Sequence, residues 1–493
     1  MASPLENIIK YVTSTFLALV LGLLVVKLGM VGSALFIVLP LVVAGALAFI
    51  YNPKLGIYIL VFMAFAIPGL TRYFPGPPFG LTIDIFLVLT LLVVFLKDFK
   101  KLDFSKANND LVWAWAIWMI FCIMMILNPL ARSMMAWFYA QRGIAMYPLL
   151  MIPLVMLVFN ERRDMNRLFV LIIIMEVFGS FWGMKQIFIG VSATENRWLM
   201  QGAASTHILF GKLRAFSYFT DAAQFGASQI HIAFMCFAYA LGIKTNWKRI
   251  LVIIGGLICF YGFMLSGSRG PLVIPAIAGF FFLLLSRYTT LFISGSLFGF
   301  MLFSFLKFTT IAQNNYNVAR LRTALNPTED ESFLVRKRRE AKVSIYLADK
   351  PLGGGIGSAG SWGRRFYPGT FLAEIGTDGH YTRIWMETGI IGLYVYLGVF
   401  IWIALRICII VFRLKDPSLR FMVGAWGSSF IGLAVASYTN GLIVQVPTGP
   451  ITYCGLAFVW MSTRWDRNIA KAKERETLQE TENRAALPNT EKN

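Results

Sequence analysis

Residues 336–360 read RKRREAKVSIYLADKPLGGGIGSAG, and residues 379–392 read GHYTRIWMETGIIG. Both lie in or beside the longest segment of the second half of the chain that is too polar to enter lipid, roughly residues 307–383. Apolar runs flank this segment on both sides. The first stretch is basic and then rich in glycine, and the second places a histidine before a new apolar run. The sequence therefore predicts one polar region between blocks of membrane-spanning helices.

The composition is typical of a polytopic membrane protein. Of the 493 residues, 57% are hydrophobic and 14% are charged, and the mean hydropathy is +0.66. A soluble domain of this size needs a more polar surface. Helices and closed barrels satisfy their backbone hydrogen bonds in lipid, and the uninterrupted apolar runs exclude the alternating strands of a barrel. We therefore predict an all-α fold, a polytopic transmembrane helical bundle.

A membrane-spanning helix needs about 20 mostly apolar residues, and this rule predicts about 14 spans. They lie near residues 11–29, 31–50, 55–70, 81–97, 111–128, 144–159, 167–189, 223–242, 249–265, 271–286, 289–306, 384–411, 420–438 and 446–463. The chain is thus predicted to contain four parts: a transmembrane bundle (1–306), an outer catalytic loop with short helices (307–383), C-terminal transmembrane helices (384–463) and a polar tail (464–493).

The basic residues orient these helices. With both termini in the cytoplasm, the dense basic segments face the cytoplasm, as the positive-inside rule requires. These segments are Lys54, 97–106, 161–167, 244–249, Arg287, 413–420 and the tail after 463. The net charge of +20 is then explained by membrane topology, and we expect no nucleic-acid partner.

The same orientation places many arginines on the outer side, where the rule predicts few. They include Arg142 at the end of a predicted outer loop at 128–143, and Arg214, Arg269, Arg336, Arg339 and Arg383. A shared anionic ligand would explain this excess. The alternative is a set of structural ion pairs, such as Arg214 with Asp221 or Arg336 with Glu340, which are four residues apart on a helix.

The turn SGSRG at residues 266–270 has the features of an anion site. Pro271 suits the first position of a helix, and the small residues before it leave backbone N–H groups open to a ligand. Arg269 adds a planar guanidinium that matches phosphate oxygens. The alternative is that Arg269 contacts a structural carboxylate or lipid headgroups.

His380 is the candidate general base. It is one of three histidines, and it lies where the polar loop meets a new apolar helix. An ordinary imidazole pKa of about 6.5 suits proton transfer near neutrality. The alternative role is a hydrogen bond at the start of the helix. The five cysteines lie in apolar runs without metal-ligand spacing, so we expect neither disulfides nor a metal or cofactor.

Four stretches, taken in order, resemble the O-antigen ligase and O-antigen polymerase superfamily of membrane glycosyltransferases. They are LRAFSYFTDAAQFGA (213–227), LSGSRGPLVIPAIAG (265–279), and KPLGGGIGSAG (350–360) followed by GHYTRIWMETGIIGLYVYLG (379–398). The long outer loop also matches, and the resemblance covers roughly residues 210–400. The earlier helices are similar only in hydropathy.

The resemblance implies an inverting, metal-independent transfer of a glycan from undecaprenyl pyrophosphate to a hydroxyl acceptor. The expected place is the periplasmic side of the bacterial inner membrane. It implies that Arg214, Arg269 and Arg336 bind the pyrophosphate and that His380 is the base, and we add Arg339 and Arg383 as substrate-binding candidates.

The acceptor in this superfamily is the lipid A core for ligases, another glycan for polymerases and a protein hydroxyl for related oligosaccharyltransferases. We expect a ligase first and a polymerase second. A transporter of lipid-linked glycans is the alternative from another class, and it would more typically show internal repeats. A purely structural membrane scaffold would not need arginines clustered on the outer side.

Overall fold

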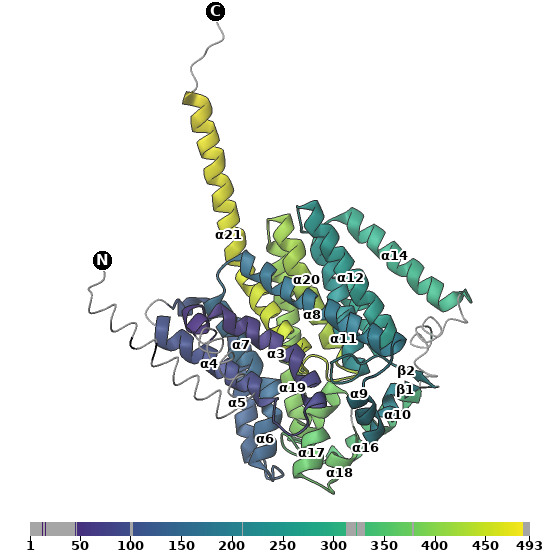
Figure 1. Cartoon of the computed structure of the whole chain (residues 1–493). Coiled ribbons are helices and arrows are strands. Elements are labelled where there is room, and N and C mark those ends of the chain that lie inside the picture. Colours follow the sequence, from purple (N-terminus) through teal and green to yellow (C-terminus); the bar gives the residue numbers. More distant parts are fainter. Residues whose placement is uncertain are drawn as a thin grey trace, which may run out of the picture.

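The computed structural model describes residues 47–98, 102–209, 211–311, 331–376 and 379–486, with residues 12, 15, 45 and 322. The described elements are helical except for the strands β1 (Ile208–Leu209) and β2 (Lys212–Leu213), which form one antiparallel hairpin. The predicted all-α bundle is therefore confirmed (Figure 1). The predicted spans at 11–29 and 31–50 lie largely outside the described residues.

The apolar runs of the sequence form the long helices. Eight helical segments of the described chain are long and apolar enough to cross a membrane. The helices at the predicted spans are α3 (Lys54–Tyr73), α4 (Leu81–Asp98), α5 (Asp110–Met124), α7 (Tyr147–Val158), α8 (Arg162–Phe188), α11 (Ala222–Ala240), α12 (Asn246–Ser266), α13 (Val273–Ser286), α14 (Thr289–Phe308), α19 (His380–Arg413), α20 (Pro417–Ala436) and α21 (Thr448–Ala486).

Short helical elements connect these long helices. They are η2 (Phe104–Lys106), η3 (Met125–Leu127), α6 (Met134–Gln141), η4 (Arg142–Met146), α9 (Ala193–Trp198), η5 (Leu199–Ala203), α10 (Ala204–His207), η6 (Gly270–Leu272), α16 (Glu331–Leu347), α17 (Gly360–Phe366) and α18 (Phe371–Glu374). The last three lie in the predicted outer loop, which therefore contains short helices as expected.

The predicted outer loop at 128–143 is wrong over much of its length. Helix α6 continues through the π-helical turn η4 into α7, so that Met134–Val158 forms one candidate span. Arg142 lies inside this span and pairs with Asp84 at the start of α4, and Tyr147 donates a hydrogen bond to the same carboxylate at 2.7 Å. The ion pair neutralises the arginine, so Arg142 is a structural residue.

The core of the bundle lies around α11 and α20. The apolar window of α20 is 83% buried, whereas α14 has no buried residue and lies at the edge of the bundle. Figure 1 shows α14 at the periphery and α21 running from the centre of the bundle far beyond it. The helical part of the polar tail is therefore a continuation of the last span.

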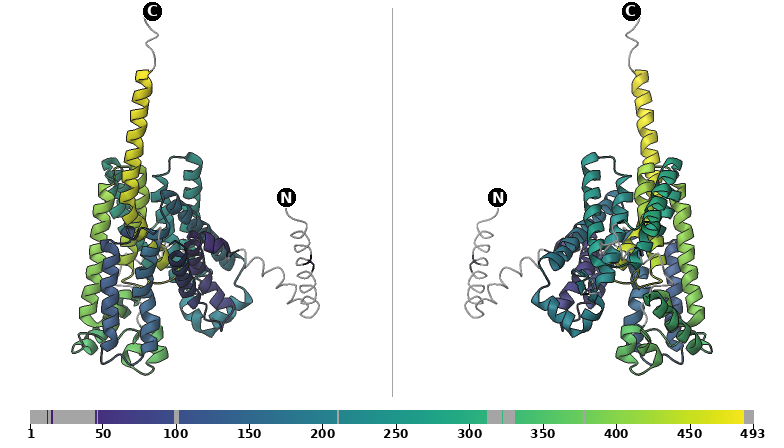
Figure 2. Two further views of the ribbon diagram at one scale, coloured as in Figure 1. Left: turned by 90° about the vertical axis from the view of Figure 1, so that its left-hand side faces the viewer. Right: turned by 90° about the vertical axis from the view of Figure 1, so that its right-hand side faces the viewer.

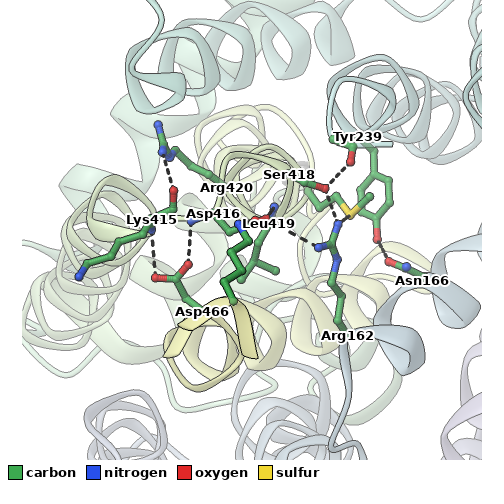
Figure 3. A network of polar contacts seen from close by, with 12 residues as sticks. Arg162, Asn166, Tyr239, Lys415, Asp416, Ser418, Leu419, Arg420 and Asp466 are labelled. Carbon is green, nitrogen blue, oxygen red and sulfur yellow. Dashed lines mark hydrogen bonds and ion pairs between the residues drawn. The ribbon is translucent and has the colours of Figure 1, made fainter. Parts of the chain in front are cut away.

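The basic loops that the sequence placed on the cytoplasmic side meet at one end of the bundle. Lys54 pairs with Asp164 at 2.9 Å. The backbone N–H groups of Lys415 and Asp416 donate to the carboxylate of Asp466 at 3.0 and 2.8 Å, as Figure 3 shows. We call this end, from which α21 leaves the bundle, the basic end (Figure 2).

Arginines at the basic end are held by main-chain and side-chain oxygens. Arg420 donates to the carbonyl oxygen of Ser286 at 3.1 Å. Arg162 donates to Ser418 Oγ at 2.6 Å (Figure 3). Ser418 in turn donates to the carbonyl oxygen of Gly242 at 2.5 Å. These bonds tie together the ends of four helices, α8, α11, α13 and α20, so the network has a clear structural role.

Candidate functional site

The candidate site lies at the opposite end, which carries α6, α9, α10 and α16 to α18 and which we call the loop end (Figure 1). Its centre is the connection between α20 and α21, residues 437–447. The carbonyl oxygen of Ser437 accepts the backbone N–H of His380 at 3.0 Å, and Tyr438 donates to Glu340 Oε2 at 3.2 Å. A Cβ placed on Gly270 would lie 3.2 Å from Thr439 Oγ1. One short connection thus contacts α19, α16 and the turn that carries Arg269.

Arg214 lies directly beside that turn. Its Nε donates to the carbonyl oxygen of Ser266 at 3.1 Å, and its Nη2 donates to Ser268 Oγ at 2.7 Å. Its Nη1 donates to the carbonyl oxygen of Thr206 at 2.9 Å. Asp221 caps α11 by accepting two backbone N–H groups of its first turn. The carboxylate predicted as a partner of Arg214 therefore serves as a helix cap.

Arg72 holds the segment that follows Arg214, a role that the sequence did not reveal. Its guanidinium donates to the carbonyl oxygens of Ser217 at 2.8 Å and Thr220 at 3.3 Å. It also lies 4.3 Å from the ring centroid of Trp198 and 4.6 Å from that of Phe216. The one sequence signal that could have identified this role is the position of Arg72, an arginine in the last turn of an apolar helix.

The second residue of the SGSRG turn, Gly267, is left-handed. Gly267 has a φ of 54° and ends α12, which favours glycine there. Its N–H donates to the carbonyl oxygen of Met264 at 3.2 Å, and the N–H of Ser268 donates to Ser266 Oγ at 3.1 Å. Two of the N–H groups predicted to be open are thus used within the turn. The anion-binding prediction for this turn therefore depends mainly on the guanidinium of Arg269.

His380 faces the interior of the bundle. Its side chain is 2% exposed, and Nε2 lies 2.8 Å from the hydroxyl of Tyr396. Sixteen residues of straight helix would separate these two positions by about 24 Å. Helix α19 is therefore bent sharply, and the bend is at Gly389, whose φ of 67° and ψ of −170° are not helical. The predicted continuous helix over 384–411 is wrong at this point.

The glycine-rich stretch fills the break in α19. The N–H of Ile391 donates to the carbonyl oxygen of Pro351 at 3.3 Å, and the N–H of Gly354 donates to that of Met386 at 2.9 Å. A Cβ on Gly353 would lie 2.4 Å from the backbone nitrogen of Gly389. The glycine-rich stretch therefore brings its backbone into close contact with the backbone of α19. The main-chain groups released by the break are satisfied by another segment.

Helix α16 brings its basic cluster to the same place. Glu340 pairs with Lys337 at 3.0 Å and accepts the hydroxyl of Thr382 at 3.3 Å. The ion-pair partner of Glu340 is therefore Lys337, one residue after the predicted partner Arg336. Nε of Arg336 is buried without a hydrogen-bond partner in the described part of the chain.

The other two candidate arginines differ in their surroundings. Nη1 of Arg339 lies 3.6 Å from a Cβ placed on Gly376, just before the start of α19. Arg383 donates from Nε to Glu387 at 2.9 Å, with Glu387 1% exposed. Arg383 therefore has a structural partner one turn along α19, and its remaining N–H groups face α17, because a Cβ on Gly360 would lie 3.6 Å from its guanidinium carbon.

The described residues contain no group of three or more His, Cys, Asp or Glu side chains placed to hold a metal ion. The loop end carries the candidate arginines on three segments: Arg214 follows the β1–β2 hairpin, Arg269 lies in the SGSRG turn, and Arg336 and Arg339 lie on α16. Guanidinium groups donate charge-assisted hydrogen bonds to phosphate-like anions.

Comparison with known proteins gives one informative relative. No protein-family model matches the chain. The chain is 22% identical to an O-antigen polymerase of Salmonella muenchen over 337 residues, which are 65% of this chain and 80% of that protein. The comparison supports the resemblance to the O-antigen ligase and polymerase superfamily that the four ordered sequence stretches indicated.

Proposed function

We propose that this membrane protein transfers a glycan from undecaprenyl pyrophosphate to a hydroxyl acceptor at the loop end of the bundle. The observation that carries the proposal is that residues 437–447 contact His380, α16 and the Arg269 turn, and that Arg214 lies beside this turn. Positive charge beside a histidine at one end of a membrane bundle suits a lipid-linked anionic donor. In this proposal the loop end faces the periplasm of a bacterial inner membrane and both termini are cytoplasmic.

The proposed reaction is a single displacement at the anomeric carbon. The acceptor oxygen attacks that carbon from the side opposite the phosphate, and the carbon–oxygen bond to the pyrophosphate breaks with inversion. Arg214 and Arg269, with Arg336 and Arg339 from α16, offset the negative charge that develops on the leaving pyrophosphate. A bidentate guanidinium contact is the geometry that this charge favours.

His380 is proposed to take the proton of the acceptor hydroxyl. Because Nε2 is hydrogen-bonded to the hydroxyl of Tyr396, Nδ1 is the ring nitrogen that takes the proton from the acceptor in this proposal. The same bond fixes the ring orientation, as the partner of a catalytic base commonly does. Arg383 is proposed to contact the glycan or the phosphate with the N–H groups that Glu387 does not use.

The first candidate for the acceptor is another lipid-linked glycan, which is the polymerase reaction. The relative from Salmonella muenchen carries that name, and this favours polymerisation over the lipid A core ligation that the sequence suggested first. Ligation, and transfer to a protein hydroxyl, use the same donor chemistry and differ only in the acceptor.

An in vitro transfer assay tests the proposal. Purified protein in nanodiscs receives an undecaprenyl-pyrophosphate glycan with one of three acceptors: a second lipid-linked repeat unit, lipid A core or an acceptor protein. We expect longer glycans in the first tube and no product with His380→Ala, whose folding is checked by size-exclusion chromatography. Transfer by His380→Ala at the wild-type rate would exclude His380 as the base. Donor movement across proteoliposome membranes without transfer in any tube would identify a transporter.

A further inference from the structure

The carboxylate of Glu340 is surrounded by donors from three separate elements. Lys337 on α16 lies 3.0 Å from Oε2, Thr382 on α19 donates to Oε1 at 3.3 Å, and Tyr438 on the α20–α21 connection donates to Oε2 at 3.2 Å. The side chain of Glu340 is 20% exposed. Three donors that converge on one partly exposed carboxylate have the arrangement of an anion-binding site.

The position of these donors connects them to the proposed chemistry. Thr382 is two residues after His380, and Tyr438 directly follows Ser437, whose carbonyl oxygen accepts the His380 backbone N–H at 3.0 Å. Thr439, the next residue, lies against the glycine that follows Arg269. The anion site therefore lies between the candidate base and a candidate pyrophosphate-binding arginine.

The charge around Glu340 is strongly positive, because residues 336–339 read RKRR. Hydrogen bonds to Tyr438 and Glu340 raise the pKa of Lys337, which keeps its ammonium group charged. One carboxylate supplies a single negative charge to this cluster, whereas a pyrophosphate supplies more charge and more acceptor oxygens for the same donors.

We infer that Lys337, Thr382 and Tyr438 form a phosphate subsite for the lipid-linked donor and that Glu340 fills it while the donor is absent. This inference rests on the proposed function, which gives the donor its pyrophosphate. Donor binding displaces the carboxylate, so Glu340 is a built-in competitor. The unpartnered Nε of Arg336, which lies one residue before Lys337, is a further donor available to the incoming phosphate.

The inference makes opposite predictions for the carboxylate and for its donors. Glu340→Gln keeps an oxygen that accepts hydrogen bonds but removes the competing charge, so the donor binds more tightly. Lys337→Met and Tyr438→Phe each remove one hydrogen-bond donor, so the lipid-linked glycan donor binds more weakly. Because Lys337 is an exposed partner, each change is about two- to fivefold in Kd.

The test measures the Kd of purified full-length protein in nanodiscs for undecaprenyl pyrophosphate and for inorganic pyrophosphate by microscale thermophoresis. Matched controls come from the same loop: Glu374→Gln removes an exposed carboxylate from α18, and Lys342→Met removes an exposed charge from α16. We expect Glu340→Gln to lower the Kd for both probes, Lys337→Met and Tyr438→Phe to raise it, and both controls to match the wild type. Hydrogen–deuterium exchange over residues 331–347 shows whether α16 stays folded.

An unchanged or higher Kd in Glu340→Gln, with α16 still protected, would overturn the inference and make Glu340 a simple tether of the helix. A Kd change in the controls as large as in Lys337→Met would overturn it too, because net charge alone would then explain the effect. Failure of the wild type to bind either probe would instead refute the donor site of the proposed function.

Discussion

The break in α19 at Gly389 offers the sharpest mutational prediction, the effect of Gly389→Ala. Gly389 combines a φ of 67° with a ψ of −170°, a region of backbone conformation that only glycine adopts readily. A Cβ at this position would lie 1.9 Å from the carbonyl oxygen of Pro351 and 2.5 Å from the backbone nitrogen of Gly353. The substitution therefore strains α19 and pushes the glycine-rich stretch away at the same time.

The cost follows from the contacts that are lost. The backbone conformation costs about 1–3 kcal/mol for a residue with a side chain. The two hydrogen bonds that close the break, from Ile391 to Pro351 and from Gly354 to Met386, contribute about 0.5–1.5 kcal/mol each. The total free-energy cost of Gly389→Ala is about 2–6 kcal/mol. The lower bound alone corresponds to a factor of about 30 in the equilibrium between the glycine-rich stretch packed against α19 and the same stretch detached from it.

Hydrogen–deuterium exchange and the transfer assay measure this effect together. We expect Gly389→Ala to lose amide protection over residues 351–358 and 384–392 and to lose transfer activity. Gly398→Ala is the matched control, because it lies on the same helix with no atom within 4 Å of its added Cβ. It should keep both protection and activity. Wild-type exchange and activity in Gly389→Ala would refute the argument that this break positions His380.

Three further predictions concern the residues around the break and the hairpin. Arg269→Lys should lose most transfer activity in the same assay, about tenfold or more, because an ammonium group cannot form the bidentate contact. Tyr396→Phe should lower kcat about fivefold without changing KM for the donor, because one hydrogen bond that orients His380 is lost; a rise in KM with unchanged kcat would contradict this. Burial lowers the pKa of His207 below its ordinary value, and its neutral Nε2 accepts the N–H of Ala222 at 3.2 Å. The hydrogen bond from Ala222 to His207 therefore stabilises the fold fully above about pH 6.5, and this stabilisation is lost as the pH falls toward the lowered pKa of His207. Hydrogen–deuterium exchange over residues 208–222 at pH 7 and pH 5 measures the loss. Equal protection at both pH values would contradict the prediction.

The long helices were predictable because lipid imposes a simple rule on length and hydropathy. Helix α3 begins one residue before its predicted start, and α20 ends two residues before its predicted end. Hydropathy did not reveal the break at Gly389, because the residues around it are apolar and the glycine-rich stretch satisfies the main chain there. A partner from another segment removes the polar signal that a broken helix otherwise leaves.

The candidate site was predictable in part. His380 and the Arg269 turn stood out because polar residues at the ends of apolar runs are few. The connection between α20 and α21 was missed, since Tyr438 and Thr439 gain their importance from segments far away in the sequence. Arg142 showed the opposite problem: it looked like a ligand for an anion, but Asp84, 58 residues earlier, neutralises it.

The location of the donor tests the central claim most directly. An undecaprenyl-pyrophosphate analogue with a photoreactive group on the sugar next to the phosphate would be crosslinked to the wild-type protein in nanodiscs, and the modified peptides identified by mass spectrometry. The account predicts crosslinks at the loop end, in residues 266–272, 336–342 and 437–447. Crosslinks confined to the basic end, around Arg162 and Arg420, would contradict it, because the donor would then bind at the wrong end of the bundle.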